Sequence, residues 1–227
     1  MLTVISLGGS IVAPDAPDTP FIKEFTSRIH RLLEKDPARS FIFVVGGGGP
    51  ARAWQAAYRG VCGETVDSEA DWIGIMATRL NARLVKAVMG DFCKNEVVID
   101  PSDVASFDGR VLVAAGWKPG FSTDFDAVVL AERFGANMVI NLSNIAKVYT
   151  DDPKKNPEAK PIDRISWEGF RAMVGDEWVP GKNVPFDPVA SRKAAELKLT
   201  VICAAGRDLD NLENILEGRD FEGTAIG

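Results

Sequence analysis

The sequence predicts an α/β fold in which helices cover a mostly parallel sheet. Short runs rich in β-branched residues alternate with segments of helical periodicity, which is the pattern of successive strand–helix–strand units. Hydrophobic residues make up 46% of the 227 residues, enough for a sizeable buried core. No repeat, low-complexity tract or Pro/Gly linker divides the chain, so we expect a single domain spanning residues 1–227.

In the first half of the chain, the pattern predicts strands over 2–7, 41–45, 97–99 and 111–114. A first helix follows from the spacing of apolar residues between Phe21 and Leu33, with Asp18 or Thr19 as its cap. A second helix is expected to begin near Pro50. A third, long helix starts around Glu69, and every fourth residue on it is apolar, which predicts a core or interface face: Trp72, Met76, Leu80, Leu84 and Val88.

The second half continues the alternation. A nearly all-apolar helix over 125–134 lacks a polar face, which implies burial against the sheet. A surface loop is expected over 150–161, where Pro, Lys and Asp are frequent. The remaining predicted elements are a strand over 137–142, a helix opened by Asp187-Pro188, a strand over 199–203, a helix over 209–216 and a closing edge strand over 223–226.

Composition excludes several classes of function. The net charge of −6 disfavours nonspecific nucleic-acid or membrane-surface binding, since both need an excess of Lys and Arg. Neither a signal peptide nor an apolar run of membrane-spanning length is visible, and three widely spaced cysteines fit the reducing cytoplasm. The lone histidine, His30, is predicted to be solvated on its helix. It leaves no histidine for a hydrolase triad or a His-rich metal site.

Three glycine-rich turns, over 8–10, 46–49 and 116–120, each follow a predicted strand and precede a helical segment. Glycine lets backbone N–H groups approach a phosphate, and the following helix adds the positive end of its dipole. One such turn is weak evidence, because strand-to-helix connections also need glycine for geometry alone. Three at the carboxyl ends of parallel strands favour an anion-binding cleft. The Walker and G-x-G-x-x-G patterns are both absent, which disfavours P-loop and Rossmann sites.

Five sequence blocks, spread over nearly the whole chain, match one family in order. They are Gly8-Gly9-Ser10, Val44-Val45-Gly46-Gly47-Gly48 with Arg52, Asp71-Trp72-Ile73-Gly74-Ile75 with Thr78-Arg79-x-Asn81-Ala82, Pro119-Gly120-x-Ser122-Thr123-Asp124, and Val148-Tyr149-Thr150-x-Asp152-Pro153-x-x-x-Pro157-x-Ala159-Lys160. The chain therefore resembles the amino acid kinase superfamily and, within it, the archaeal-type UMP kinases. This resemblance implies a three-layer αβα sandwich of the carbamate kinase-like fold.

The resemblance also implies which residues hold the substrates. Residues 1–120 would bind the phosphoryl acceptor UMP and residues 121–227 would bind ATP. The implied acceptor residues are Gly47, Asp71 (through ribose hydroxyls), Gly116, Trp117, Lys118, Pro119, Gly120, Phe121 and Ser122. The implied ATP residues are Gly9, Ser10, Gly48, Arg52, Ser143, Asn144, Tyr149 and Asp152. Asp124 is similar to the superfamily's acidic organiser of the catalytic groups, and such proteins form homohexamers built from dimers.

Each of these residues also has a plain structural interpretation. Asp124 falls where an N-cap belongs, and capping is the commoner role of Asp at such a position. Asp71 could be a solvated residue near a helix start, where its charge favours the helix dipole. Tyr149 could pack outward from a strand. Arg52 and Lys118 could be solvated surface charges.

Two departures from the family pattern concern the phosphate charges. Many superfamily members have a lysine two residues before the first glycine pair, where this chain has Ser6. Lys118 is our candidate for meeting the acceptor phosphate in its place, with Lys182 a further source of positive charge. The usual Val-Asp-Gly run is Ile145-Ala146-Lys147 here, which changes the charge and backbone freedom beside the nucleotide.

The expected reaction is transfer of the γ-phosphoryl group of ATP, with Mg²⁺ held mainly by phosphates because no dedicated carboxylate cluster is visible. No general base is needed, since a phosphate oxygen of UMP is already an ionised nucleophile. Two alternatives remain. One is a superfamily kinase for isopentenyl phosphate, carbamate, glutamate or aspartate, the first disfavoured by the position of His30. The other is a weakly active nucleotide-binding regulator.

Overall fold

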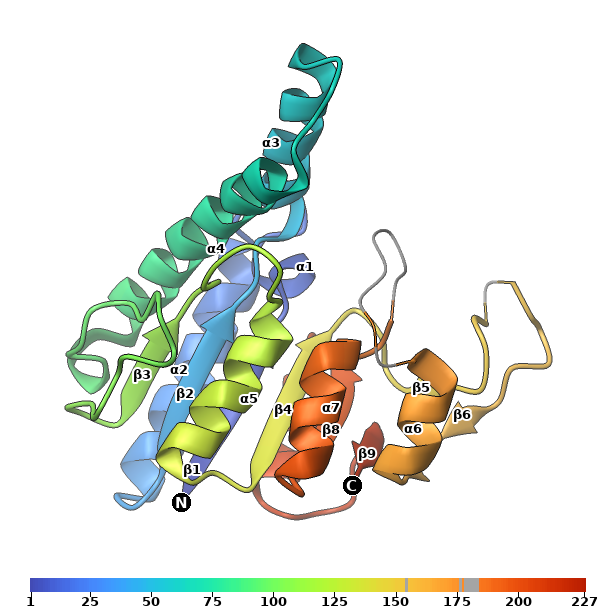
Figure 1. Cartoon of the computed structure of the whole chain (residues 1–227). Helices are drawn as coiled ribbons and strands as arrows, with labels where there is room; N and C mark the ends of the chain where they lie inside the picture. Colours follow the sequence, from blue (N-terminus) through green and yellow to red (C-terminus); the bar gives the residue numbers. More distant parts are fainter. Residues whose placement is uncertain (154, 176, 178–183) are drawn as a thin grey trace.

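The computed structural model describes residues 1–153, 155–175, 177 and 184–227 (Figure 1). The strands are β1 (Leu2–Leu7), β2 (Ser40–Val45), β3 (Val111–Ala114), β4 (Met138–Ser143), β5 (Val148–Tyr149), β6 (Pro161–Ile162), β7 (Arg164–Ile165), β8 (Thr200–Ala205) and β9 (Thr224–Ile226). The helices are α1 (Gly9–Val12), α2 (Thr19–Lys35), α3 (Gly48–Val61), α4 (Asp67–Met89), the 3₁₀ turn η1 (Gly90–Phe92), α5 (Thr123–Phe134), α6 (Trp167–Val174), α7 (Pro188–Glu196) and α8 (Leu209–Leu216).

In the described part of the chain, seven strands form one sheet in the order β3-β2-β1-β4-β8-β9-β7. The first five strands of this order are mutually parallel, and only β9 runs antiparallel to its neighbour β8. Parallel strands need crossover helices, which explains the alternation of strand and helix along the sequence. The short β5–β6 hairpin lies outside this sheet.

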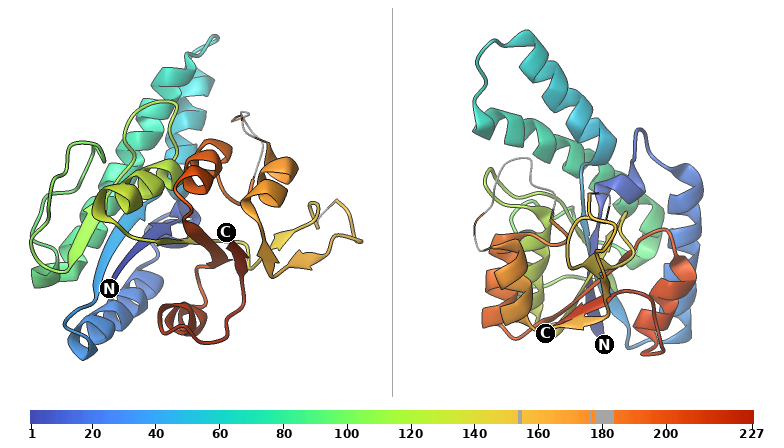
Figure 2. Two further views of the ribbon diagram at one scale, coloured as in Figure 1. Left: turned by 60° about the horizontal axis from the view of Figure 1, so that its bottom comes forward. Right: turned by 90° about the vertical axis from the view of Figure 1, so that its right-hand side faces the viewer.

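Helices cover both faces of the sheet and give three layers, which are clearest in the edge-on view of Figure 2. Apolar residues of α1, α2, α4 and α8 pack on one face, and those of α5, α6 and α7 on the other. Alternate residues of β2 serve the two cores: Phe41 and Phe43 pack with α2, whereas Ile42 and Val44 face the α5 side. Because both faces are covered, the central strands are apolar throughout, as is typical of parallel sheets.

Helices α3 and α4 extend beyond the sheet as a hairpin, at the top of Figure 1. No residue of α3 is buried. On α4 the buried face combines apolar residues with the small or polar Gly74, Thr78 and Asn81. The predicted apolar stripe is not core at its first three positions, since Trp72, Met76 and Leu80 are 40%, 57% and 72% exposed. These three residues are therefore not part of the core, and the interpretation that the stripe forms an interface stays a prediction.

Several sequence expectations are corrected by the structure. Residues 97–99 form no strand; Val98 makes only an isolated bridge to Ala114. The C-terminal strand β9 is not an edge, because β7 pairs on its far side. Helices α1 and α6 and strand β7 were not predicted, since each is too short to show a clear period. No helix in the described residues has the combination of length and apolarity needed to cross a bilayer.

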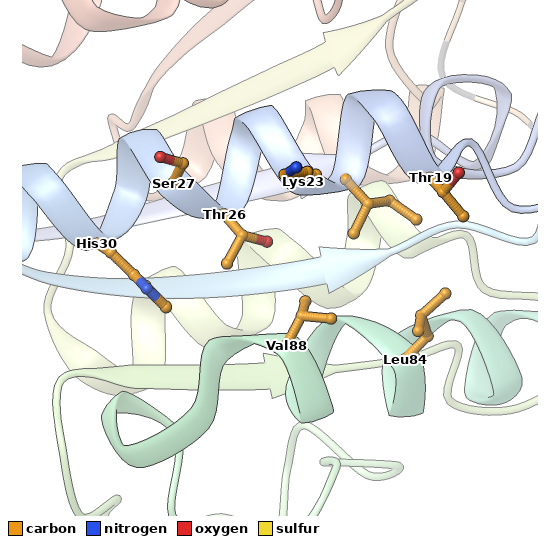
Figure 3. Close-up of a pocket in the computed structure, with 8 residues that line it drawn as sticks. Thr19, Lys23, Thr26, Ser27, His30, Leu84 and Val88 are labelled. Atoms are coloured by element: carbon orange, nitrogen blue, oxygen red, sulfur yellow. The ribbon is translucent and has the colours of Figure 1, made fainter.

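The prediction that His30 is solvated is also wrong. His30 lines a hollow of about 460 Å³ between α2 and α4, together with Leu84 and Val88 (Figure 3). Its ring lies 5.0 Å from that of Phe92, and its Nε2 is buried without a partner among the described residues. The helical pattern placed His30 on the polar side of α2, but α4 packs against that side.

Candidate active site

The three glycine turns meet at one edge of the sheet. Leu7 pairs with Val45 on β2 and with Leu142 on β4, so the residues that follow these three positions lie side by side. The row continues to β3, where Ala114 pairs with Val44. Since these four strands are parallel, their following turns all open at the carboxyl edge, where ligands bind in open α/β sheets. The structure thus brings together the turns that the sequence placed at one edge.

The first two turns are in direct backbone contact, and this contact requires glycine. A Cβ atom on Gly9 would lie 2.0 Å from the backbone nitrogen of Gly48, and one on Gly46 would lie 2.4 Å from that of Gly9. Gly48 has a φ of +65°, a region that other residues rarely adopt. The glycine residues therefore allow the backbones of the two turns to lie close together.

This contact brings the backbone N–H groups of two turns together at the carboxyl edge of the sheet. Gly9 and Ser10 form the start of α1, and Gly47 and Gly48 are the N-cap and first residue of α3. The first N–H groups of a helix have no intrahelical acceptor. The two turns thus offer donors from two neighbouring strand ends, which is the arrangement that an oligophosphate needs.

Two polar residues on the buried face of α4 hold the second and third turns. Asn81 Nδ2 donates to the carbonyl oxygens of Gly46 and Gly47 at 2.9 and 3.1 Å. Thr78 Oγ1 accepts from the N–H of Gly116 at 2.8 Å. Neither residue had a predicted role. Two polar side chains three residues apart, on a helix face that is otherwise apolar, were the sequence feature that could have indicated one.

The segment 116–122, which we call the acceptor loop, is tied to α4 at two more points. Arg79 Nη2 donates to the carbonyl of Trp117 at 3.1 Å, and Asp71 Oδ2 accepts from the N–H of Gly120 at 3.0 Å. Asp71 is therefore not merely a solvated residue near a helix start. Lys118 extends over the ring of Trp117, with its Nζ 3.9 Å from the ring centroid.

Asp124 does not cap α5. The N-cap is Ser122, whose Oγ accepts from the N–H of Phe125 at 3.2 Å. The carboxylate of Asp124 instead accepts from Ser6 Oγ at 2.9 Å and from the N–H of Asp187 at 3.3 Å. It thereby links β1, α5 and the start of α7 beside the glycine turns. The Ser6 that replaces the family lysine is thus a direct partner of Asp124.

Three carboxyl groups near this point have raised pKa values. Burial, with Asp187 nearby, raises the pKa of Asp124 to about 6 even though Ser6 lowers it. Burial also raises the pKa of Asp126 to about 7 and that of Asp187 above its usual value. Asp187 caps α7 by accepting from the N–H of Ala190 at 2.7 Å. Perturbed carboxyl groups gathered in a cleft are typical of functional sites.

The residues expected on the ATP side are less closely grouped. Ser143 and Asn144 end β4 next to Gly8, whose N–H donates to the carbonyl of Leu142. Arg52 lies on the first turns of α3, and its Nη2 donates to the carbonyl of Pro14 at 3.0 Å. Tyr149 on β5 and Asp152 in the following loop belong to the hairpin beyond β4, which Figure 1 places beside α6.

In the altered run before β5, Lys147 Nζ forms an ion pair with Asp163 Oδ1 at 2.5 Å. Lys182, the other suggested cation, lies outside the described residues. Among the residues that are described, no group of three His, Cys, Asp or Glu side chains could hold a metal ion.

Comparison with known proteins identifies this arrangement. The family model described as "Amino acid kinase family" matches residues 1–204. The chain belongs to the amino acid kinase family. The resemblance seen in the five sequence blocks is thereby confirmed, as is the three-layer fold with its mostly parallel sheet.

Relatives within the family are similar over nearly their whole length. The uridylate kinase of Methanospirillum hungatei is 38% identical over 226 residues, covering 98% of this chain and 93% of that protein. The uridylate kinase of Pyrococcus abyssi is 31% identical, with coverage of 100% and 99%. The crystal structure of uridylate kinase from Archaeoglobus fulgidus superposes with a TM-score of 0.85 at 30% identity, covering all of both chains.

Proposed function

We propose that this member of the amino acid kinase family is a UMP kinase, which transfers the γ-phosphoryl group of ATP to UMP and releases UDP and ADP. The observation that supports this assignment is the near-complete match to uridylate kinases, in sequence and in fold. The proposal includes a role in pyrimidine nucleotide biosynthesis and a cytoplasmic location, where the three free cysteines would stay reduced.

In this proposal the cleft holds the two nucleotides with their phosphates facing each other. UMP lies against the acceptor loop and Asp71, within the part formed by residues 1–120. ATP lies against the part formed by residues 121–227, beside Ser143, Asn144, Tyr149 and Asp152. An oxygen of the UMP phosphate attacks the γ-phosphorus of ATP, a new P–O bond forms, and the bond to the β-phosphate oxygen breaks as ADP leaves. No general base is required, because the attacking oxygen is already ionised.

The protein's task is therefore to position two anions that repel each other and to neutralise their charge. The turns that carry Gly9, Ser10, Gly47 and Gly48 are in direct backbone contact, so their N–H groups would serve a single phosphate site. Mg²⁺ accompanies ATP as part of the substrate and is bound mainly by phosphate oxygens, in keeping with its preference for few protein ligands. Asp124 fixes the relative positions of β1, α5 and α7 around the transfer point.

An ADP-release assay on the purified protein with a panel of acceptors tests the assignment. The panel contains UMP, CMP, dCMP, isopentenyl phosphate, carbamate, glutamate and aspartate. We expect UMP to have the highest kcat/KM. A higher kcat/KM for another acceptor would reassign the substrate within the family, and tight nucleotide binding without turnover would identify a regulator instead.

Lys118→Ala is expected to raise the KM for UMP about tenfold or more, while the KM for ATP changes less than twofold. In the proposal, the ammonium group of this lysine on the acceptor loop leaves the ring of Trp117, where it lies without substrate, and meets the acceptor phosphate. One lost charge-assisted contact is worth about 1.5–3 kcal/mol. Steady-state kinetics with each substrate varied in turn gives the two constants. The exposed Lys94→Ala is the matched control, and equal KM values for UMP in both variants would remove Lys118 from the site.

The proposal also includes self-association, with a hexamer built from dimers as the expected form. Trp72, Met76 and Leu80 make a continuous exposed apolar ridge along α4, four residues apart. The same stripe continues through Leu84 and Val88 into the hollow beside α2 (Figure 3). Exposed apolar surface of this extent on a helix is typical of a protein–protein interface.

Leu80→Glu is expected to shift the protein to a smaller assembly, because the charge would have to be buried within the apolar ridge. Light scattering coupled to size-exclusion chromatography measures the mass directly. Val61→Glu at the tip of α3 is the control, since Val61 is 85% exposed and lies off the ridge. An unchanged mass for Leu80→Glu would place the interface elsewhere.

A further inference from the structure

A buried carboxyl group lies behind the acceptor loop and takes no part in the proposed transfer. Asp126, in the first turn of α5, is 0% exposed. Its Oδ2 accepts from the backbone N–H of Trp117 at 3.1 Å. Its Oδ1 is also buried and has no partner among the described residues. A buried polar atom without a partner costs folding free energy, so an apolar residue would suit this position better if it were only core.

The contact with Trp117 differs from the loop's other anchors. The N–H of Gly116, the carbonyl of Trp117 and the N–H of Gly120 are bound by side chains of α4, and the Trp117 side chain donates a hydrogen bond to Asp100 before β3. The bond from Asp126 comes from α5, the helix on which Asp124 lies two residues away. It therefore ties the acceptor loop directly to the element that presents Asp124. A shift of about 1 Å between reacting groups can lower a rate by about 10²-fold, so such a tie has catalytic value.

We propose that Asp126 is a positioning residue that fixes the acceptor loop against α5 and so holds the acceptor nucleotide in register with Asp124. This inference rests on the proposed function, because it assigns the loop to the acceptor. It adds a residue outside the five family blocks, which end at Asp124 in this region.

The strength of this tie depends on pH. Burial raises the pKa of Asp126 to about 7, and the carboxylates that face it, Asp124 on α5 and Asp100 before β3, add to the rise. Lys118 lies near Asp100 and partly offsets that charge. An ionised carboxylate accepts a stronger hydrogen bond than a neutral carboxyl group. The bond to Trp117 is thus strengthened as pH rises through about 7.

Folding stability changes in the opposite direction. The pKa of Asp126 is higher in the folded chain than its usual 3.8, so the folded state binds more protons than the unfolded state between these values. The contribution of Asp126 to stability therefore falls as pH rises from about 4 to about 7. An asparagine at this position, which has no charge to bury, removes that loss.

Two substitutions separate positioning from packing. Asp126→Asn keeps an oxygen acceptor for Trp117, whereas Asp126→Leu keeps the branched shape and offers none. We expect Asp126→Leu to raise the KM for UMP about tenfold with the KM for ATP nearly unchanged, and Asp126→Asn to stay within about threefold of the wild type at pH 6. Equal KM values for UMP in the wild type and in Asp126→Leu would overturn the proposal. Equal loss in the Leu and Asn variants would do the same.

A pH series decides the matter even if Asp126→Leu does not fold. The ratio of the UMP KM of Asp126→Asn to that of the wild type is expected to rise about threefold to tenfold between pH 5.5 and 8.5. The phosphate of UMP titrates in the same way in both proteins, so the ratio removes its contribution and reports the effect of the Asp126 carboxylate, including its coupling to Asp124. A constant or falling ratio would overturn the proposal.

Hydrogen exchange distinguishes failure of this inference from failure of the proposed function. Without any substrate, the amides of residues 116–122 are expected to exchange faster in Asp126→Leu than in the wild type, and those of β1 to be unchanged. If the wild type does not phosphorylate UMP but the loop exchanges faster in Asp126→Leu than in the wild type, the proposed function is wrong and Asp126 does hold the loop. If the wild type phosphorylates UMP but the loop exchanges at the same rate in Asp126→Leu and in the wild type, Asp126 does not hold the loop and the proposed function stands.

Discussion

Replacing Asp124 with asparagine is expected to lower kcat for UMP phosphorylation by about 10²–10³-fold, the usual cost of removing one preorganised charged or polar group from an active site. The carboxylate joins Ser6, α5 and the start of α7, so its charge and its two hydrogen bonds set the geometry of the cleft floor. The melting temperature should not fall at pH 8. Because burial raises the pKa of Asp124 to about 6, its ionised form destabilises the fold above that pH, and the neutral amide removes this cost.

A true helix cap provides the contrasting control. Asp208 caps α8 by accepting from the N–H of Asn211 at 2.9 Å, and it is not among the residues expected to bind either nucleotide. Asp208→Ala is expected to lose about 1 kcal/mol of unfolding free energy and no activity. Thermal unfolding and single-turnover kinetics, measured on both variants, complete the comparison. If Asp124→Asn behaves like Asp208→Ala, Asp124 is a structural residue only.

Local features of the fold were predictable from the sequence because local interactions determine them. Asp18 and Asp187 cap their helices as predicted, each accepting from a backbone N–H three residues ahead. The buried strands of the parallel sheet were equally clear, since both of their faces are apolar. Residues 97–99 share that apolar character but pair with the end of β3 only through Val98, and His30 faces α4, a helix distant in sequence. Whether a segment pairs as a strand and whether a side chain is buried both depend on tertiary packing, which the periodicity of the sequence does not reveal.

The candidate site divides in the same way. The common location of the glycine turns could be predicted from the order of strands and from the residue types that such turns need. Asp71 and Asp124 could be predicted from the sequence motifs in which they lie. The side chains that hold those turns could not be predicted from the sequence. Thr78, Asn81 and Asp126 lie on helix faces, and only the fold shows which backbone group is near each of them. The capping interpretation of Asp124 failed for a similar reason, since Ser122 satisfies the helix and frees the aspartate for Ser6.

Gly9→Ala is expected to lower kcat/KM for both substrates by about 10²-fold or more and to destabilise the protein. The new Cβ would lie 2.0 Å from the backbone nitrogen of Gly48 and 2.7 Å from the carbonyl carbons of Gly46 and Gly47. These are main-chain atoms of the turn that follows β2, so they cannot rotate aside as a flexible side chain could. The two turns must separate, and their N–H groups then no longer converge on one phosphate chain.

Gly60→Ala tests whether this effect belongs to the turn contact or to glycine replacement in general. Gly60 lies in α3, and a Cβ there would meet no atom within 4 Å, so the substitution is expected to stabilise the helix by about 0.5–1 kcal/mol with kcat/KM unchanged. Isothermal titration with a nonhydrolysable ATP analogue separates the two causes of lost activity in Gly9→Ala. If the folded variant binds the analogue as tightly as the wild type, the first turn does not hold the donor phosphates. The convergence of backbone amides would then have to serve the acceptor alone.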